Sequence, residues 1–220
     1  MPAYLPLRLS ISHNEWTDFF DSSNNYVSFK NKNESFGINV DKSYYISLCL
    51  FIYLNETGAI RISSNSRNTL KFLIDTSSFD NCLHKNEEGG SLYINANQGE
   101  CVQDRVCSIG SKTPSVGTYC SITASPVYPN RDYILETSII ESGDENTSGN
   151  NNMLLLNGEI HMKSINLSYS KLDHSNFYYT YFDSNSNLSF STFSNNTSSN
   201  QEHSQAYHDE ASDSQFKIIY

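Results

Sequence analysis

Short apolar phrases return along this chain at intervals of 21 to 33 residues, and this recurrence restricts its fold more than any other feature. In four phrases an apolar residue is followed, at fixed places, by an apolar residue or threonine, a serine and a second apolar residue. The phrases are Ile74–Asn81, Leu135–Ser142, Leu167–His174 and Leu188–Asn195, with their serines at Ser77, Ser138, Ser170 and Ser191. A looser fifth copy, Val102–Ile109, has Arg105 in the serine place.

A second phrase begins with glycine and ends with isoleucine. Its copies are Gly58–Ile62, Gly90–Ile94 and Gly117–Ile122, whose starts lie 32 and 27 residues apart. Two phrases with compatible spacing predict a chain that coils and returns to the same place once per repeat; about four or five such coils fit between residues 58 and 196. Each coil then contributes two or three short strands, which pair with the strands of the next coil and stack their inward side chains on it.

Composition divides the chain into three parts. Residues 1–25 are expected to form an N-terminal cap with a short helix at Ser12–Asp21, which a capping box at Ser12 and Glu15 begins. Such a helix is a candidate cover for the open end of the stack. Residues 26–196 are expected to form the parallel β-helix, and residues 197–220 a flexible, acidic and polar tail.

Corners of the coil are expected where Asp and Asn cluster, because these residues tolerate a left-handed backbone. The clusters are Asp80-Asn81, Asp173-His174 and Asn195-Asn196. The most apolar run, Tyr44–Leu54, is too short to span a bilayer and is predicted to be a buried strand. The start of the chain has no small-residue cleavage site after its apolar residues, so no signal peptide is predicted.

Charge and cysteine content limit the partners. The net charge of −10 comes from 14 basic and 24 acidic residues without a basic run, which disfavours nucleic acid and anionic membranes as partners. Apolar residues make up only 37% of the chain, but 15 Tyr and 12 Phe can bury large areas and form a core. The five cysteines contain no C-x-x-C pair and are expected to be buried small apolar residues. A Cys101–Cys107 or Cys82–Cys120 bridge is the alternative in a secreted protein.

Three phrases carry a resemblance to a known group of proteins: Gly90–Ile94, Cys101–Cys107 and Leu188–Asn196. Together they resemble the right-handed parallel β-helix (pectin-lyase-like) proteins, over about residues 55–196. In particular, the chain is similar to large Asn/Ser-rich surface-protein families of protists and to bacterial polymorphic outer-membrane repeats. This resemblance implies an extracellular or cell-surface protein with a signal or anchor. The chain shows neither, which leaves a cytoplasmic location open.

Catalytic motifs of this fold family are missing. The N-T-D, D-D, G-H-G and R-x-K phrases of polygalacturonases do not occur. His161 is interpreted as an outward or paired histidine. Asp104 and Arg105 form the one suggestive pair, but neighbouring residues of a strand point to opposite faces and would not act on one substrate. No catalytic, cofactor-binding or metal-binding residue is therefore predicted, and no cofactor.

The aromatic run Phe177–Phe182 is the remaining functional feature. Either Tyr178 with Thr180 and Phe182, or Tyr179 with Tyr181, should face outward, where tyrosines suit contact with carbohydrate or protein. The function we expect is a non-enzymatic recognition or adhesion module at the cell surface or in secretion. One alternative is a polysaccharide-active lyase or glycosidase, which requires acids of neighbouring coils to converge on one outward strand face. Another is a small β-sandwich binding domain, in which the repeats would be accidental.

Overall fold

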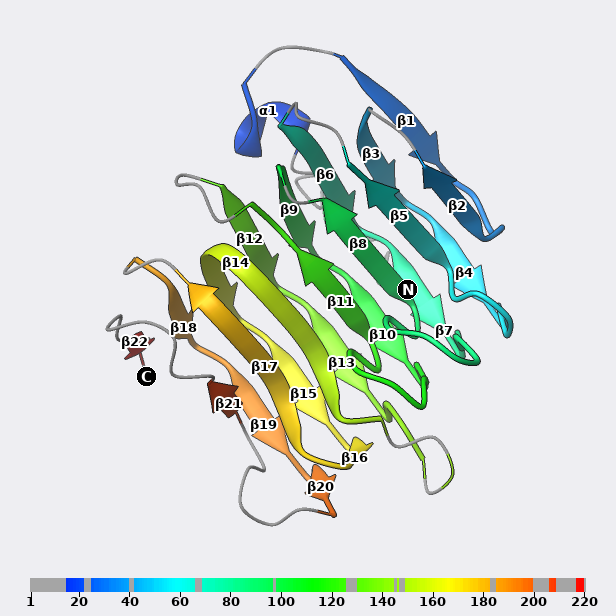
Figure 1. Ribbon diagram of the computed structural model, residues 1–220, viewed down its shortest axis with the longest axis vertical. Coiled ribbons are helices and arrows are strands. Elements are labelled where there is room, and N and C mark those ends of the chain that lie inside the picture. The colour runs from blue at the N-terminus through cyan, green and yellow to red at the C-terminus, as the bar shows by residue number, and fades with distance from the viewer. Residues whose placement is uncertain are drawn as a thin grey trace, which may run out of the picture.

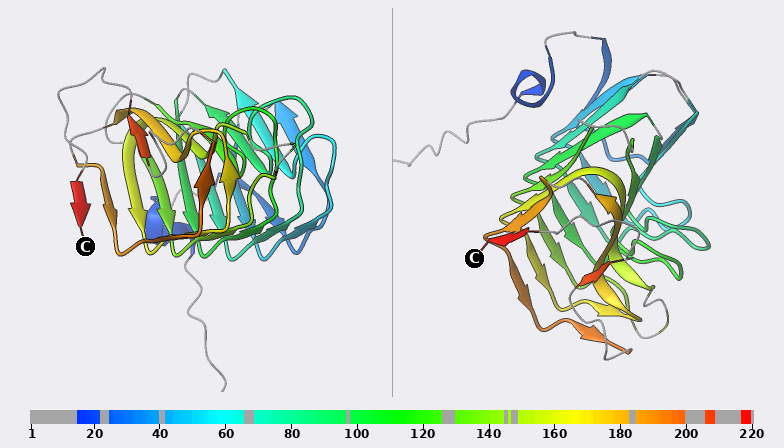
Figure 2. Two further views of the ribbon diagram at one scale, coloured as in Figure 1. Left: turned by 90° about the horizontal axis from the view of Figure 1, so that it is seen from below. Right: turned by 60° about the vertical axis from the view of Figure 1, so that its left-hand side comes forward.

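A computed structural model describes residues 15–21, 25–39, 42–65, 69–96, 98–125, 130–144, 146, 149–182, 185–199, 206–208 and 217–219. The chain winds as a right-handed parallel β-helix, with one short helix, α1 (Trp16–Phe19), near its start (Figure 1). Figure 2 shows the coils stacked one beside the next. None of the described helices is long and apolar enough to cross a membrane.

Three parallel sheets form the faces of the coil. Sheet A contains β1 (Tyr26–Lys30), β3 (Ser43–Ser47), β6 (Leu70–Asp75), β9 (Gly99–Asp104), β12 (Arg131–Leu135), the second half of β14 (Asn151–Lys163), β18 (Asn187–Ser189) and β22 (Lys217–Ile219). Sheet B contains β2 (Phe36–Asn39), β5 (Ile60–Ser64), β8 (Leu92–Ala96), β11 (Cys120–Thr123), the first half of β14, β17 (Ser175–Phe182) and β21 (Ala206–His208). Sheet C contains β4 (Leu50–Ile52), β7 (Ser78–Asp80), β10 (Cys107–Ile109), β13 (Ser138–Ile140), β15 (Asn166–Ser168) and β19 (Thr192–Ser194). The short strands β16 (Lys171–Leu172) and β20 (Thr197–Ser198) pair with each other.

This topology confirms the parallel β-helix and shows that the β-sandwich alternative is wrong. Every pair of named strands is parallel and joins one coil to the next, whereas a sandwich is built from antiparallel pairs. Pairing also continues past residue 196, where β20, β21 and β22 join β16, β17 and β18.

The Gly…Ile phrases occupy one column of the coil, as predicted. Ile62 lies beside Ile94, and Ile94 beside Ile122, in the register of sheet B. All three are buried in the lumen, which is the interior that the three sheets enclose. A buried apolar side chain of this size stabilises the fold by roughly 1.5–3 kcal/mol, so each column adds stability coil by coil.

The serine phrases are only partly equivalent. Ile74 and Leu188 occupy one column of sheet A, so Ser77 and Ser191 both follow the first corner, which is the turn directly after sheet A. Leu135 lies one place later, in the column of Asp75, and Leu167 belongs to sheet C. Serine is so frequent in this chain that the same pattern arises at places that are not equivalent in space.

Each coil turns at two corners through a single residue with positive φ. After sheet A these residues are Asn31, Leu48, Thr76, Arg105, Glu136, Ser164 and Phe190, and after sheet C they are Tyr53, Asn81, Gly110, Glu141, Tyr169 and Asn195. The predicted corners at Asn81 and Asn195 are confirmed, with φ of 50° and 53°. At Asp173-His174 the chain bends between β16 and β17, as predicted, but without the expected left-handed backbone, since neither residue has a positive φ. Their amides donate to the backbone oxygens of Gly149 and Asn150.

The helix lies on the side of the coil rather than over its end. Trp16 and Phe20 pack against Leu73 and Val102, which are outward residues of β6 and β9. Two apolar residues on an outer strand face need such a cover, so the helix docks there. The capping box is formed by Glu15 and Asp18; Ser12, the predicted first member, lies outside the described residues.

All five cysteines are free thiols, so neither suggested bridge is formed. Cys49, Cys82, Cys101 and Cys120 are buried, as expected of small apolar residues, and Cys107 is half-buried.

Candidate binding site on the outer face of sheet A

A cluster of polar side chains lies on the outer face of sheet A, on the neighbouring strands β12 and β14. Tyr133 and His161 are register partners, and their rings stack at 4.4 Å between centroids with 4° between planes. Glu159 is two places before His161 on β14 and therefore shares its face. The Tyr133 hydroxyl donates to Glu159 Oε1 at 2.8 Å, and His161 Nε2 lies 2.8 Å from the same oxygen.

The histidine is oriented by its surroundings. Its Nε2 also lies 3.1 Å from the backbone oxygen of Asn185. Because both neighbours of Nε2 are acceptors, this nitrogen carries the hydrogen. His161 is thus outward and paired, as the sequence predicts, with 28% of its side chain exposed.

Arg131 joins this cluster to the helix. Its side chain donates to the backbone oxygen of Phe19, and its Nε lies 3.8 Å from Glu100 Oε2. Burial raises the pKa of Glu100, while the positive charge of Arg131 opposes this shift. Burial and the hydrogen bond to Glu159 raise the pKa of Tyr133, so this hydroxyl remains a donor at neutral pH. The cluster offers both donors and acceptors at a partly exposed surface.

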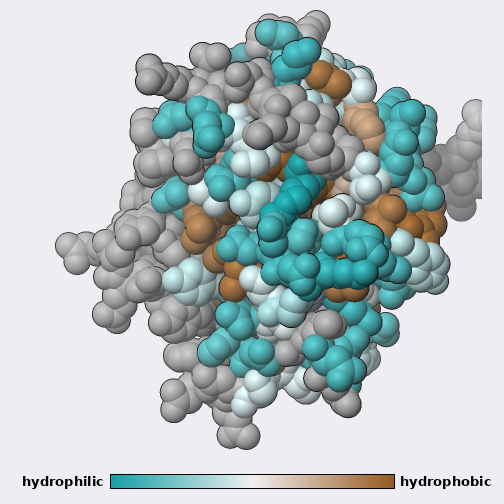
Figure 3. All heavy atoms as spheres, turned by 45° about the vertical axis from the view of Figure 1, so that its right-hand side comes forward, coloured by the Kyte–Doolittle hydropathy of each residue, from teal (hydrophilic) through white to brown (hydrophobic). Residues whose placement is uncertain are grey.

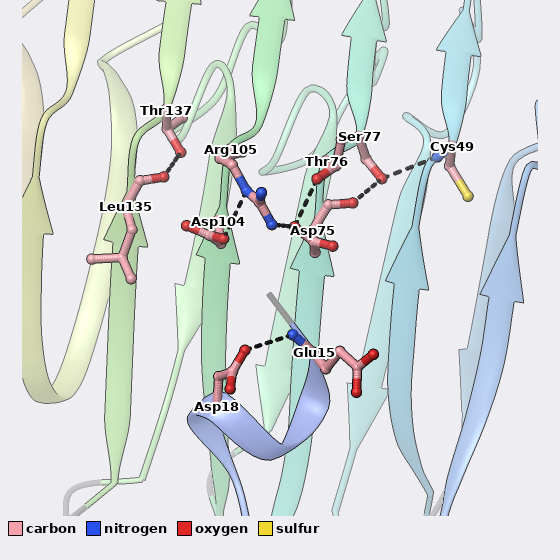
Figure 4. A network of polar contacts seen from close by, with 10 residues as sticks. All are labelled: Glu15, Asp18, Cys49, Asp75, Thr76, Ser77, Asp104, Arg105, Leu135 and Thr137. Carbon is pink, nitrogen blue, oxygen red and sulfur yellow. Dashed lines mark hydrogen bonds and ion pairs between the residues drawn. The ribbon is translucent and has the colours of Figure 1, made fainter. Parts of the chain in front are cut away.

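A second cluster joins two coils at the first corner, where Arg105 lies between Asp75 and Asp104 (Figure 4). Arg105 Nη2 is 2.8 Å from Asp75 Oδ1, and its Nε is 3.1 Å from Asp104 Oδ2. Arg105 has a φ of 52°, which breaks the alternation of the strand. The expectation that Asp104 and Arg105 point to opposite faces is therefore wrong: the left-handed residue turns the guanidinium back onto the carboxylates.

The second cluster is enclosed. The side chain of Asp75 is 0% exposed and that of Asp104 3%, and Thr76 Oγ1 also donates to Asp75 at 2.8 Å. Burial lowers the pKa of Arg105, but the charges of Asp75 and Asp104 outweigh this and raise it. The corner that follows β6 is fixed by Ser77, whose hydroxyl donates to the Asp75 carbonyl oxygen and accepts from the Cys49 amide of the preceding coil (Figure 4). This arrangement clamps two coils together.

A carboxyl group also lies inside the lumen. Asp132 points inward from β12 between its register partners Cys101 and Ile160. It is fully buried, and neither of its oxygens has a hydrogen-bond partner in the described part of the chain. Burial raises its pKa well above the ordinary range of a carboxyl group. Nothing in the sequence marks Asp132 as an inward residue, because the register that turns it inward depends on how the coils stack.

The aromatic run Phe177–Phe182 divides between the outer surface and the lumen. Tyr178 faces outward and is half-buried, while Tyr179 is buried in the lumen with Phe177, which decides between the two alternatives. The side chains of residues 180–182 lie outside the described part. No group of three or more His, Cys, Asp or Glu that could hold a metal ion occurs among the described residues.

The sequence predicts the outward, paired position of His161, but it does not reveal Tyr133, Glu159 and Arg131 as members of the same cluster. The E-x-H spacing at residues 159–161 was visible, and it places both side chains on one strand face. The sequence does not show that Tyr133 of the preceding coil lies beside His161, because the loop that returns the chain from sheet C to sheet B has no fixed length.

The fold defines the class of protein: a right-handed parallel β-helix, or β-solenoid. Comparisons with protein-family models, with curated proteins and with solved structures found no match. The narrower resemblance to pectin-lyase-like and protist surface proteins thus rests on the sequence phrases alone.

Proposed function

We propose that this β-solenoid is a non-enzymatic recognition module, at the cell surface or secreted, that binds carbohydrate through the outer face of sheet A. The observation that carries the proposal is the partly exposed cluster of Tyr133, Glu159, His161 and Arg131. Carboxylate, imidazole and guanidinium groups held on neighbouring rigid strands suit a ligand rich in hydroxyl groups, which both donates and accepts hydrogen bonds. A protein surface as the ligand is the other outcome of the test.

The first experiment is binding of the full chain to an array of immobilised oligosaccharides, followed by calorimetry on any saccharide that binds. We expect His161→Ala to weaken binding by about tenfold, since a hydrogen bond between a charged or polar site and a ligand contributes about 1.5 kcal/mol. Tyr133→Phe should weaken binding because it frees Glu159 to reorient.

A matched control is Tyr93→Phe. This variant also removes one tyrosine hydroxyl from the outer face of the coil, but on sheet B. There the Cζ atom of Arg61 lies 4.1 Å from the centroid of the Tyr93 ring. This variant should bind like the wild type. Binding of no saccharide, or equal losses in Tyr93→Phe and Tyr133→Phe, would contradict the proposed site, and capture of a protein ligand lost with His161→Ala would change the ligand class.

In the enzymatic alternative, Asp75 and Asp104 would be the acids that act on the polysaccharide. Two acids of neighbouring coils converge on the outer face of sheet A, as a polysaccharide-active enzyme requires. Their pairing with Arg105 and their enclosure favour a structural role. Incubation of the chain with polygalacturonate tests this: release of new reducing or unsaturated ends that Asp104→Asn abolishes would establish the enzyme.

A further inference from the structure

The side of the molecule that carries β4, β7 and the loops after sheet C is mainly hydrophilic, with separate apolar patches (Figure 3). One of these loops, between β7 and β8, contains an almost completely buried histidine, His84, which is 7% exposed. The three residues that follow it, Lys85, Asn86 and Glu87, are exposed. A buried histidine beneath an exposed segment can couple the position of that segment to pH, because its charge changes near neutral pH.

The ring of His84 holds this segment by accepting hydrogen bonds. Its Nδ1 accepts from the backbone amide of Glu87 at 2.8 Å and from that of Asn86 at 3.3 Å. Because both groups are donors, Nδ1 carries no hydrogen and the imidazole is neutral in this arrangement. A protonated imidazole donates from both nitrogens and accepts nothing, so protonation of His84 removes both hydrogen bonds.

Residues 85–88 lie between two points that are fixed to the next coil. Before the segment, the His84 amide donates to the Lys112 backbone oxygen at 3.1 Å, and after it the Gly89 amide donates to the Val116 backbone oxygen at 3.1 Å. Gly89 has a φ of 72°, a conformation that glycine adopts without steric cost. The segment can therefore move while the strands before and after it stay paired.

In its closed position the segment occupies polar groups of the neighbouring coils. Arg61 on β5 donates to the backbone oxygen of Glu88 at 3.1 Å and to the carboxylate of Glu87. Ser121 Oγ on β11 donates to the Glu88 carboxylate at 2.9 Å. Opening of the segment releases the Arg61 guanidinium from both glutamates and leaves it over the Tyr93 ring, on the outer face of sheet B.

The surroundings of His84 oppose its protonation while the loop is closed. Burial lowers the pKa of His84 below its ordinary value, and the positive charge of Arg61 lowers it further, whereas Glu87 acts in the opposite direction. Two lysines of the neighbouring loops are paired with acids: Lys85 with Glu56 at 2.6 Å, and Lys112 with Asp144 at 2.8 Å. In an open loop the imidazole returns to water, where it titrates near about pH 6.5. The open loop therefore binds a proton more readily than the closed loop, and the closed loop loses stability as the pH falls below this value.

We propose that His84 is a pH-sensitive switch of this loop: its neutral ring holds residues 85–88 closed, and its protonation opens the segment and frees Arg61. Sheet B then presents a free guanidinium on its outer face in acid, and a guanidinium paired with carboxylate at neutral pH. This inference concerns a loop on sheet B and does not depend on the ligand proposed for sheet A.

The test is amide hydrogen exchange of the full chain from about pH 7.5 to about pH 5.5, expressed as protection factors so that the intrinsic effect of pH on exchange cancels. We expect the protection of the Asn86 and Glu87 amides to fall by up to about tenfold per pH unit below about pH 6.5, because opening takes up one proton. The amide of Ile94, in a strand paired on both sides, should keep its protection. Constant protection of Asn86 and Glu87 over this range overturns the proposal.

Two variants isolate the role of His84. His84→Asn places an amide oxygen in the position of Nδ1, an acceptor that does not titrate, so the protection of residues 86 and 87 should persist in acid. His174→Asn is the matched control, because His174 is exposed in the corresponding loop of a later coil, between β16 and β17, and its loss should leave the pH dependence as in the wild type. Equal pH dependence in His84→Asn and the wild type overturns the proposal.

Nitrogen NMR of the wild-type imidazole checks the switch without any variant. At neutral pH the hydrogen of the His84 ring should be on Nε2, because Nδ1 accepts from two amides. A hydrogen on Nδ1 at neutral pH would contradict the proposal.

Discussion

At the scale of single residues, the buried carboxyl group of Asp132 makes the stability of the protein depend on pH. In the unfolded chain a carboxyl group ionises near pH 4 (about 3.9 for Asp), whereas burial raises the pKa of Asp132 in the folded protein. Above pH 4 the unfolded state therefore binds fewer protons, and the free energy of unfolding falls as the pH rises toward the folded-state pKa. Asp132→Leu places a side chain of similar size between Cys101 and Ile160. It removes the fall in the free energy of unfolding with pH, and it removes a buried carboxyl group without a hydrogen-bond partner in the described part of the chain. We expect it to raise the free energy of unfolding by about 1–3 kcal/mol at pH 7, with a smaller gain at pH 4. Urea unfolding at both pH values measures the effect. Asp144→Leu is the control, because Asp144 is half-exposed and 2.8 Å from Lys112; it should give no gain. Equal gains in both variants would contradict the assignment.

At the scale of elements, the corners decide how much of this fold could be read from the sequence. The repeats predicted parallel strands, and the Asn residues predicted the corners at Asn81 and Asn195, because Asn adopts a left-handed backbone at little cost. The corners at Phe190 and Arg105 carry no such signal: their positive φ is imposed by the stacking of whole coils. The site was hidden for the same reason, since Tyr133 and Glu159 become neighbours only through a register set by loops of variable length. A corner that holds an unsuitable residue should be improvable. Phe190 has a φ of 49° and is 64% exposed, so Phe190→Asn removes backbone strain and little buried surface. We expect a gain of about 1 kcal/mol in the free energy of unfolding. The reverse change at the second corner, Asn195→Phe, should cost a similar amount, and a loss in both variants would argue against strain at these corners.

At the scale of the whole molecule, a solenoid is stabilised by contacts between neighbouring coils, so its parts need not unfold together. The helix α1 is held by side chains on one outer face, chiefly Leu73 and Val102, and by the hydrogen bond from Arg131 to Phe19, whereas each inner coil is paired on both sides. We therefore expect α1 to detach before the coils unfold. Trp16 is the one tryptophan of the chain and is buried in this contact, so its fluorescence reports the docking of α1, while far-UV circular dichroism reports the strands. In a urea titration the fluorescence transition should come at the lower concentration. Arg131→Ala should move the fluorescence transition to still lower urea and shift the dichroism transition less, because it removes the hydrogen bond to the helix and, within the coils, the 3.8 Å pair with Glu100. Coincident transitions in the wild type would show instead that α1 and the coils unfold as one cooperative unit. The side-docked helix would then be an integral layer of the β-helix.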